Sequence, residues 1–271
     1  MHTSELVDTI DARMLGPLRL TVGARSAVPS ATKPRSLLAL FALNPHRQLS
    51  TGSLITELWE ECPPRRAATT LQTYVLQLRR LLAEASGMES PEVAARLLRT
   101  VNSGYVFTPD DLYVDIHGFH QLADRAEMSD RAGRTAEAAT LYRTAEKLCA
   151  GSPLIDVQHG PMLRAEVVRL EHSLLCVTER RIAMELRLGY HRAILGELAS
   201  LTAQHPFHED FHAQFMVALY RSGNRTGALE VFQRIRGAMV GEFGLEPSRK
   251  LQELQYSIMN DDGALDLPIA S

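Results

Sequence analysis

The sequence has no long apolar run, few cysteines and few aromatic residues. No stretch approaches the roughly 18 uninterrupted apolar residues of a membrane-spanning helix. The first residues carry Glu5, Asp8 and Asp11, where a secretory signal peptide has a basic start and an apolar middle. These absences exclude the membrane and secretory classes, so we expect a cytoplasmic protein that does not bind a membrane.

Paired cysteines are also missing. Cys62, Cys149 and Cys176 are odd in number, widely spaced and never in a C-x-x-C arrangement, so we expect reduced thiols. Disorder is excluded as well, because 45% of the 271 residues are hydrophobic and the formal net charge is only −3. A chain of this length folds into one to three domains with real cores.

Signatures of catalysis and of bound cofactors are missing too. The chain has no G-x-x-x-x-G-K-[ST] phosphate loop, no G-x-G-x-x-G and no G-x-S-x-G. Residues His208 to His212 do read H-E-x-x-H, in which two histidines bind zinc and the glutamate acts as a base. A third ligand is lacking, because Phe215 and Ala218 stand where the extended motif has Gly and His. We therefore expect a helix start there, with no metal, no cofactor and no enzymatic activity.

Charge divides the chain into two parts of opposite sign. Residues 14 to 109 hold eleven basic and six acidic side chains, or +5, whereas residues 112 to 271 hold 17 basic and 21 acidic ones, or −4. Such asymmetry indicates two domains, of which the basic one suits a polyanion. We expect domains at 14–110 and 112–260, followed by a disordered tail at 261–271.

The basic part reads as strands, three helices and a hairpin. Alternating apolar residues with Gly and Pro breaks predict two or three short antiparallel strands over 14–31. Helical periodicity follows over three stretches, 33–43, 50–61 and 65–85. Residues 93–107 predict a hairpin with a tight turn. This order is typical of a winged helix-turn-helix, whose third helix enters the major groove of DNA and whose hairpin contacts an adjacent groove or the backbone.

The third helix has two contrasting sides. Its core-facing stripe, at steps of three and four, is Ala68, Leu71, Val75, Leu78 and Leu82. The opposite side carries groups suited to DNA. Arg can form two hydrogen bonds to guanine, Gln can form two to adenine, and Thr or the apolar Leu76 can contact a thymine methyl group. The candidate DNA-reading residues are Arg66, Thr69, Thr70, Gln72, Thr73, Gln77 and Arg80. An ordinary solvated helix face would look similar, but the charge and the element order favour DNA.

From Asp115 onward, strand signals stop and helical stretches recur. Gly133, Gly189 and Gly223 each separate two amphipathic stretches, and the last two are 34 residues apart, the tetratricopeptide period. A small residue and an aromatic residue follow two of these glycines at the same offsets, as Ala138 and Tyr142 and as Ala228 and Phe232. We expect an all-α repeat domain that offers a binding surface and performs no chemistry.

Several blocks of sequence resemble one family. Those in the first part are Glu57-Leu58-Trp59, Pro63-Pro64, Ala68 to Arg80 and Gly104-Tyr105, and those in the second are 205–209, 218–223, 228–229 and 242–247. Together they are similar to the Streptomyces antibiotic regulatory proteins (SARPs), most of all to the small two-domain type of the daunorubicin-cluster activator. The resemblance implies a mostly α fold with a small β part: an OmpR-like winged helix followed by a tetratricopeptide-like bacterial transcriptional activation domain (BTAD).

The resemblance also implies a function. Such proteins bind direct repeats overlapping the −35 region of promoters, as two copies side by side, and recruit RNA polymerase holoenzyme to antibiotic biosynthesis genes. On this chain, the candidate backbone or wing contacts to DNA are Lys33, Arg35, Arg99, Asn102, Ser103 and Tyr105. The candidate contacts to the polymerase sigma subunit are Pro64 and Arg65, in the loop before the third helix.

Two positions depart from the family pattern: Cys149 replaces a Trp, and Asn102-Ser103 replaces the more usual Pro-Gly-type wing residues. The residues leave two alternatives open, a tetratricopeptide adaptor whose winged helix binds protein and a zinc hydrolase. With no receiver domain or nucleotide site expected, control would rest on the protein's own abundance or on an unidentified ligand of the helical domain.

Overall fold

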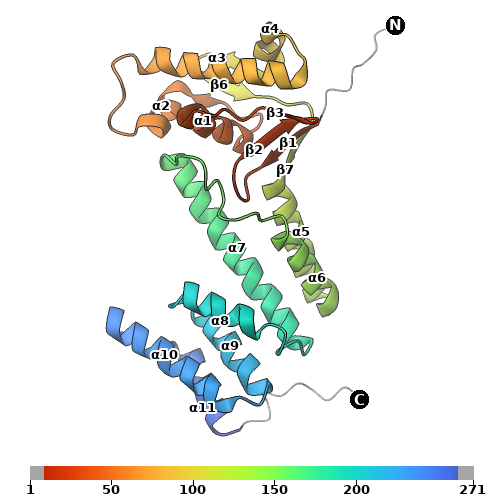
Figure 1. Cartoon of the computed structure of the whole chain (residues 1–271), viewed down its shortest axis with the longest axis vertical. Coiled ribbons are helices and arrows are strands. Elements are labelled where there is room, and N and C mark those ends of the chain that lie inside the picture. Colours follow the sequence, from red (N-terminus) through yellow and green to blue (C-terminus); the bar gives the residue numbers. More distant parts are fainter. Residues whose placement is uncertain (1–8, 262–271) are drawn as a thin grey trace. The chain divides into compact units, whose positions relative to one another are not determined.

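The structure is a computed structural model that describes residues 9–261. The chain forms two compact units, which we describe separately (Figure 1). Unit 1 contains the chain up to residue 122 together with 145–174, and unit 2 contains 123–144 and the chain from residue 175. The expected tail lies outside the described residues except for Asp261.

A four-stranded sheet opens unit 1. Its strands are β1 (Ile10–Arg13), β2 (Arg19–Val22), β3 (Arg25–Ser26) and β7 (Leu112–Val114). Across the sheet they lie in the order β3-β2-β1-β7. Ile10 of β1 lies opposite Val22 of the antiparallel β2 and opposite Leu112 of the parallel β7. The antiparallel strands expected over 14–31 are confirmed by β2 and β3, whereas β1 lies wholly before residue 14 and was not predicted. Sequence reasoning missed β7, because three residues are too short for a detectable alternation.

Three helices follow, as expected: α1 (Thr32–Leu43), α2 (Thr51–Trp59) and α3 (Ala67–Ser86). α1 is buried along most of its length. α2 begins after Ser50, whose hydroxyl oxygen accepts the backbone N–H of Ser53 at 3.0 Å and so satisfies one free donor of the first turn. α3 ends at Gly87, which takes the left-handed conformation that closes many helices.

The wing is the hairpin of β5 (Leu98–Val101) and β6 (Gly104–Phe107), with β4 (Leu49–Ser50) on the other side of β6. A Cβ atom at Gly104 would lie 2.3 Å from the carbonyl oxygen of Leu49, so only glycine lets β4 pair here. The hairpin expected over 93–107 is wrong for its first five residues. Val93–Leu97 forms one π-helical turn (η1) after the short α4 (Ser90–Glu92), and strand pairing with β6 begins only at Leu98, opposite Phe107.

Residues 145–174 belong to the same compact unit as the winged helix, and two carboxylates from later parts of the chain accept backbone N–H groups of the loop between β1 and β2. Asp115 accepts from Met14 and Leu15 at 2.8–2.9 Å, and Asp156 accepts from Leu18 at 2.7 Å. Asp115 is buried, which raises the pKa of its carboxyl, while the bonds from Leu15 and Met14 act in the opposite direction. The loop between β1 and β2 is therefore anchored from two later parts of the chain.

Glu57 joins α2 to the start of α7 (Pro161–Arg187). Its buried carboxylate accepts the backbone N–H groups of Gly160, Met162 and Leu163 at 3.0, 2.6 and 3.1 Å. These donors at the start of a helix lack intrahelical partners, and a negative charge there also meets the positive end of the helix dipole. A Cβ at Gly160 would lie 2.0 Å from the carbonyl oxygen of Glu57, so the approach requires glycine.

Unit 2 is helical throughout its described residues. It contains parts of α5 (Asp115–Arg131), α6 (Thr135–Glu146) and α7, with the whole of α8 (Leu195–Gln204), α9 (Glu209–Arg221), α10 (Arg225–Phe243) and α11 (Arg249–Met259). Gly133, Gly189 and Gly223 all have positive φ, at 75°, 82° and 84°, where the chain reverses between helices. The small and aromatic residues expected to share a register are buried, namely Ala138, Tyr142, Ala228 and Phe232. The predicted helical repeats are thus confirmed.

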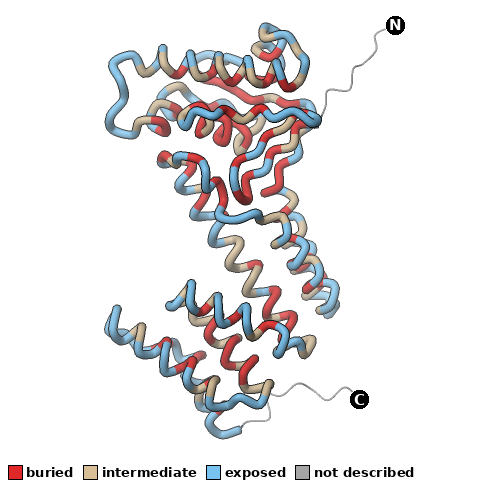
Figure 2. The backbone as a smooth tube through the Cα atoms, viewed as in Figure 1, coloured by how far each residue is buried: buried red, intermediate tan, exposed pale blue. Residues whose placement is uncertain are grey.

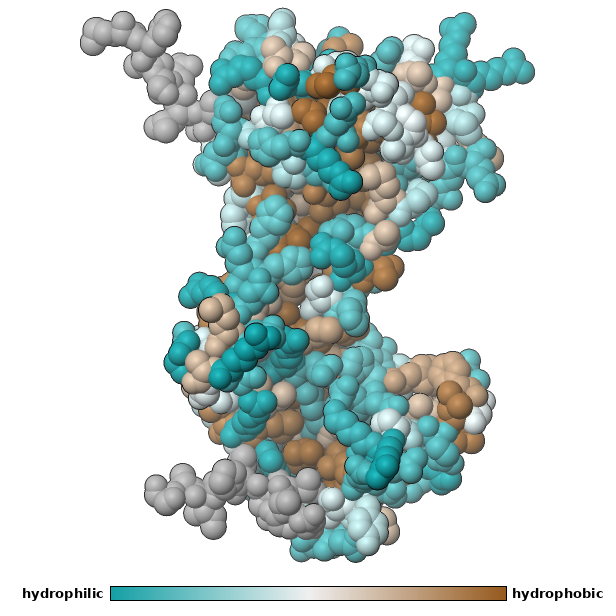
Figure 3. All heavy atoms as spheres, turned by 180° about the vertical axis from the view of Figure 1, so that it is seen from behind, coloured by the Kyte–Doolittle hydropathy of each residue, from teal (hydrophilic) through white to brown (hydrophobic). Residues whose placement is uncertain are grey.

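Apolar side chains gather on the surface at the carboxyl end of α10 (Figure 3). The rings of Phe207 and Phe243 meet edge to face with their centroids 4.8 Å apart, and both remain exposed beside Val240 and Leu245. Within residues 9–261, no helix is long and apolar enough to cross a membrane.

Candidate nucleic-acid interface

α3 is anchored by one side and exposed on the other, which Figure 2 shows as alternating red and blue along the helix. Leu71, Val75, Leu78 and Leu82 are at most 1% exposed and pack into the core of unit 1. Ala68, which we expected in this stripe, is exposed because it lies on the first turn, ahead of the first buried residue. The packed stripe fixes the rotation of the helix and hence the direction of the opposite side.

That opposite side brings most of the predicted reading residues together. Five of them are exposed, namely Arg66, Thr69, Gln72, Thr73 and Arg80. Thr70 and Gln77 are half-buried at the edges of the stripe. The hydroxyls of Thr70 and Thr73 donate to the carbonyls of Arg66 and Thr69 at 3.1 Å, which leaves their oxygen lone pairs for other donors. The surface therefore offers amide donors and acceptors between two guanidinium groups.

The arginines around this surface have no acidic partner in the part of the chain that the structure describes. Across residues 9–261, no carboxylate oxygen lies within 4.0 Å of the side chains of Arg65, Arg66, Arg80 or Arg99. Arg96, by contrast, contacts both Glu92 and Asp110. Unpaired guanidinium groups keep their full charge and their donors for an outside anion, and they fit phosphate or guanine bidentately.

Arg79 fastens the wing to α3. Its Nε donates to the carbonyl of Leu98 at 2.9 Å and its Nη2 to the hydroxyl of Thr100 at 2.8 Å. Burial lowers the pKa of this guanidinium from its usual value, yet an arginine remains charged at any physiological pH. Sequence reasoning missed this role, since the spacing of Arg79 on α3 shows only that it borders the core.

The wing tip consists of Asn102 and Ser103, both exposed. Asn102 takes a left-handed conformation with φ of 48°, which asparagine tolerates better than most residues. Arg99 is also exposed on β5. Tyr105, predicted as a wing contact, is instead buried on β6, with its ring edge to face on Phe41 and its hydroxyl pKa raised by burial.

Lys33 and Arg35 make internal contacts away from α3's outer side. Lys33 donates its ammonium to the carbonyl of Leu58 and lies over the ring of Trp59, 5.5 Å from its centroid. Arg35 donates to the carbonyl of Pro29 at 3.1 Å and pairs with the carboxylate of Asp156 at 2.9 Å. Both side chains thus hold parts of unit 1 together, which sequence spacing could not show because Asp156 is 121 residues away.

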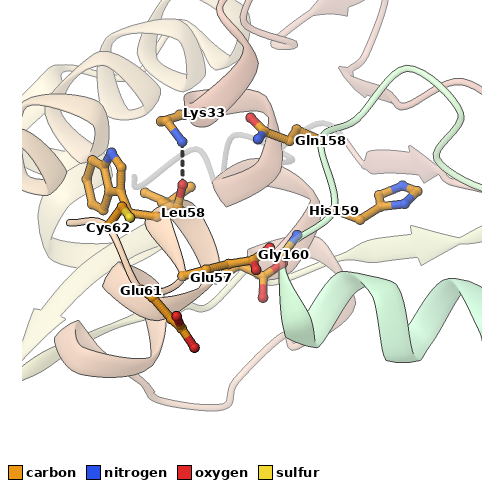
Figure 4. A pocket seen from close by; sticks show the side chains of 10 residues that line it. Lys33, Glu57, Leu58, Glu61, Cys62, Gln158, His159 and Gly160 are labelled. Atoms are coloured by element: carbon orange, nitrogen blue, oxygen red, sulfur yellow. Dashed lines mark hydrogen bonds between the residues drawn. The ribbon is translucent and has the colours of Figure 1, made fainter.

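A shallow cavity of about 480 Å³ lies beside the loop between α2 and α3 (Figure 4). Its lining includes Lys33, Trp59 and three carboxylates, of which Glu57 already holds the start of α7. An acidic lining of this kind repels phosphate, so the cavity does not extend the DNA surface. The predicted polymerase contacts Pro64 and Arg65 are exposed further along the same loop.

The H-E-x-x-H segment has the structure of a helix start. His208 is the N-cap of α9, and its Nδ1 accepts the backbone N–H of Phe211 at 3.4 Å. His212 is buried at 2% exposure with its Nδ1 3.1 Å from the carbonyl of His208, and burial lowers the pKa of its imidazole. Within the described part of the chain, no group of three or more His, Cys, Asp or Glu side chains is placed to hold a metal ion.

Comparison with known proteins identifies both parts of the chain. The family described as "Transcriptional regulatory protein, C terminal" matches residues 25–107, and the "Bacterial transcriptional activator domain" matches residues 114–259. Regulatory protein DnrI of Streptomyces peucetius is 42% identical over 93% of this chain and 93% of its own length. The chain belongs to the SARP family. The expected fold class, a winged helix-turn-helix followed by a helical BTAD, is confirmed, and this SARP is a transcriptional regulator.

Other relatives share the same two parts. Transcriptional regulator RedD of Streptomyces coelicolor is 32% identical over 96% of this chain and 73% of its own length. Regulatory protein AfsR of Streptomyces griseus is 33% identical over 96% of this SARP, which spans only 26% of AfsR. The solved structure of Mycobacterium tuberculosis EmbR in complex with a low affinity phosphopeptide superposes with a TM-score of 0.82 at 28% identity, covering 96% of this chain and 66% of EmbR.

Proposed function

We propose that this SARP is a cytoplasmic activator that binds direct repeats overlapping the −35 element and recruits RNA polymerase holoenzyme to antibiotic biosynthesis genes. It needs no cofactor and catalyses no reaction. The observation that carries the proposal is the outer side of α3, where Gln72, Thr73 and Gln77 lie between arginines without an acidic partner among the described residues. The relatives, which bear the names of regulators, support it.

The length of α3 suits this mode of binding. Arg66 and Arg80 are separated by fourteen residues, or about 21 Å of helix at 1.5 Å per residue. The major groove is about 12 Å wide, so arginines at the two ends can reach phosphates while the turns between them contact base edges. Gln72, Thr73 and Gln77 would read sequence, whereas Arg66 and Arg80 would supply most of the affinity.

The wing supplies a second point of contact. Arg99, Asn102 and Ser103 form its exposed part, and Arg79 holds it against α3. A wing on one side of the helix gives the bound protein a direction along the DNA. On direct repeats, two copies would therefore lie head to tail, without the two-fold symmetry that a palindrome requires.

The other predicted residues divide into two groups. Pro64 and Arg65 are exposed in the loop before α3, and we assign them to the polymerase sigma subunit. Lys33, Arg35 and Tyr105 are engaged inside unit 1, so we assign them to supporting the DNA-binding surface and not to DNA itself. The functional domains remain those proposed from charge, 14–110 for DNA and 112–260 for activation.

Binding to promoter DNA as a function of salt tests the proposal. The full chain should bind a direct-repeat promoter fragment more tightly than a shuffled fragment of equal length. The logarithm of its affinity should fall linearly with the logarithm of salt concentration, by about 0.9 per neutralised phosphate. In a reconstituted transcription reaction, the protein should raise initiation by polymerase holoenzyme from that promoter. A flat salt dependence, or equal affinity for shuffled DNA, would contradict DNA reading and favour an adaptor that binds protein.

A further inference from the structure

Leu76 is an apolar side chain in the middle of the polar side of α3. It is 45% exposed, whereas the core leucines of the same helix are at most 1% exposed. Gln72 and Arg80 lie one turn before and one turn after it, and both are exposed. Leu76 is therefore at the centre of the surface that the proposed function places in the major groove, and the fold does not need it as core.

The chemistry of the major groove restricts what such a side chain can contact. Guanine, adenine and cytosine present hydrogen-bond donors and acceptors there, and the apolar group on a base edge is the 5-methyl of thymine. A leucine placed against a donor or acceptor would remove it from water without replacing its hydrogen bond, which costs free energy. A leucine placed against a methyl group removes apolar surface from water, which is favourable.

We propose that Leu76 is a specificity-determining residue that recognises the 5-methyl group of a thymine in each repeat. The proposal rests on the DNA-binding function proposed above and names a feature of its target. Gln72 and Leu76 are four residues apart, or about 6 Å along α3, which is close to the rise of two base steps. The thymine should therefore lie within about two base pairs of the base that Gln72 contacts.

Replacing single thymines with deoxyuridine tests this contact, because the exchange removes only the 5-methyl group. Binding of the full chain is measured on a footprinted repeat in which each thymine is replaced in turn. At one thymine of each repeat, the wild-type protein should lose about fourfold in affinity, the effect of one buried methyl group. Leu76→Ala should bind the unmodified repeat more weakly and should lose nothing further at that position, as expected for two coupled partners.

Two variants serve as controls. Gln72→Ala should bind more weakly and yet keep the wild-type penalty at the same thymine. Leu245→Ala removes another exposed leucine, from unit 2, and should bind every fragment as the wild type does. Leu76→Ala should unfold at the wild-type temperature, which separates a lost contact from a damaged helix.

The outcomes distinguish the inference from the function on which it rests. If Leu76→Ala keeps the full penalty at every thymine, or if the wild type shows none, Leu76 does not read a methyl group, although specific promoter binding still stands. If the wild-type protein does not prefer promoter DNA to shuffled DNA, both proposals fail.

Discussion

Arginines of the winged helix and of the helical repeats are used in opposite ways. Around the outer side of α3, Arg65, Arg66, Arg80 and Arg99 meet no carboxylate among residues 9–261. In unit 2, most cations are paired within the protein, among them Arg131, Arg143, Arg180, Arg181, Arg187, Arg236, Arg249 and Lys250. One residue type thus stays free of carboxylates in one described region and forms internal ion pairs in the other.

The buried pair in unit 2 shows how far this difference goes. Arg181 is 4% exposed, Glu185 is fully buried, and the two side chains form an ion pair. Glu185 also pairs with Arg143, and Arg181 also pairs with Glu197. Such a network stabilises the fold only while every charge keeps its partner. The exposed arginines beside α3 stay in water, so the free protein has no such desolvation cost to offset there.

Breaking the buried network should have the largest effect. Glu185→Ala removes the buried carboxylate that both Arg181 and Arg143 contact, and we expect the free energy of unfolding to fall by about 3–5 kcal/mol. Urea denaturation measures this loss. Arg249→Ala removes an exposed pair with Glu253 and should change stability by less than about 1 kcal/mol. Equal losses in the two variants would show that burial does not distinguish these pairs.

Removing the carboxylate that caps α7 should come next. Glu57→Ala leaves the N–H groups of Gly160, Met162 and Leu163 without their acceptor, and we expect a loss of about 1–3 kcal/mol in unfolding free energy. Glu57→Gln, which keeps one acceptor oxygen, should lose less. Glu60→Ala, at an exposed pair with Arg164, serves as the control and should unfold almost as the wild type does. A Glu57→Ala protein of wild-type stability would refute the cap.

Removing an unpaired arginine should affect binding and leave stability alone. Arg80→Ala should weaken promoter binding about tenfold and reduce the salt slope by about 0.9, because one phosphate contact is lost. Its unfolding curve should match the wild type, since the side chain has no internal ion pair among the described residues. Arg249→Ala is the matched control, with binding unchanged. Wild-type affinity of Arg80→Ala would remove this residue from the interface.

A buried imidazole should give the smallest effect. Burial lowers the pKa of His212 below its ordinary value of 6.5, so the unfolded chain takes up a proton that the folded protein resists. The stability that neutral His212 contributes is present above about pH 6.5 and is lost as the pH falls below it. Melting temperatures at about pH 7.5 and pH 5.5 should therefore differ less in His212→Asn than in the wild type. His117→Asn, at an exposed site, should retain the wild-type difference.

Local spacing was enough to predict much of the fold. The stripe from Leu71 to Leu82 fixed which side of α3 is buried, and the glycines at 133, 189 and 223 marked the reversals between helices. Both follow from the 3.6-residue period and from the freedom of glycine at positive φ, which act within one or two turns of chain. The outer side of α3 could be described in advance for the same reason.

Contacts between distant parts of the chain could not be predicted in this way. Lys33 and Arg35 carry charges that suit DNA, and only the approach of Trp59 and Asp156 shows that they are engaged. Tyr105 belongs to the predicted hairpin, but which side of a strand faces the core depends on what packs there. The exposure of residues on one side of a helix could therefore be predicted better than the exposure of residues whose contact partners are distant in the sequence.

The contact between Glu57 and the start of α7 limits where a gene for such a regulator can be cut and recombined without disrupting the winged helix. A gene fragment ending at residue 110 would encode the whole winged helix, but it would lack the donors at residues 160–163 and the carboxylates of Asp115 and Asp156 that hold residues 14–18. The smallest exchangeable cassette therefore extends to the beginning of α7. Recombinants that swap activation domains between relatives should remain folded when joined after that point, and should lose their DNA-binding half when joined before it.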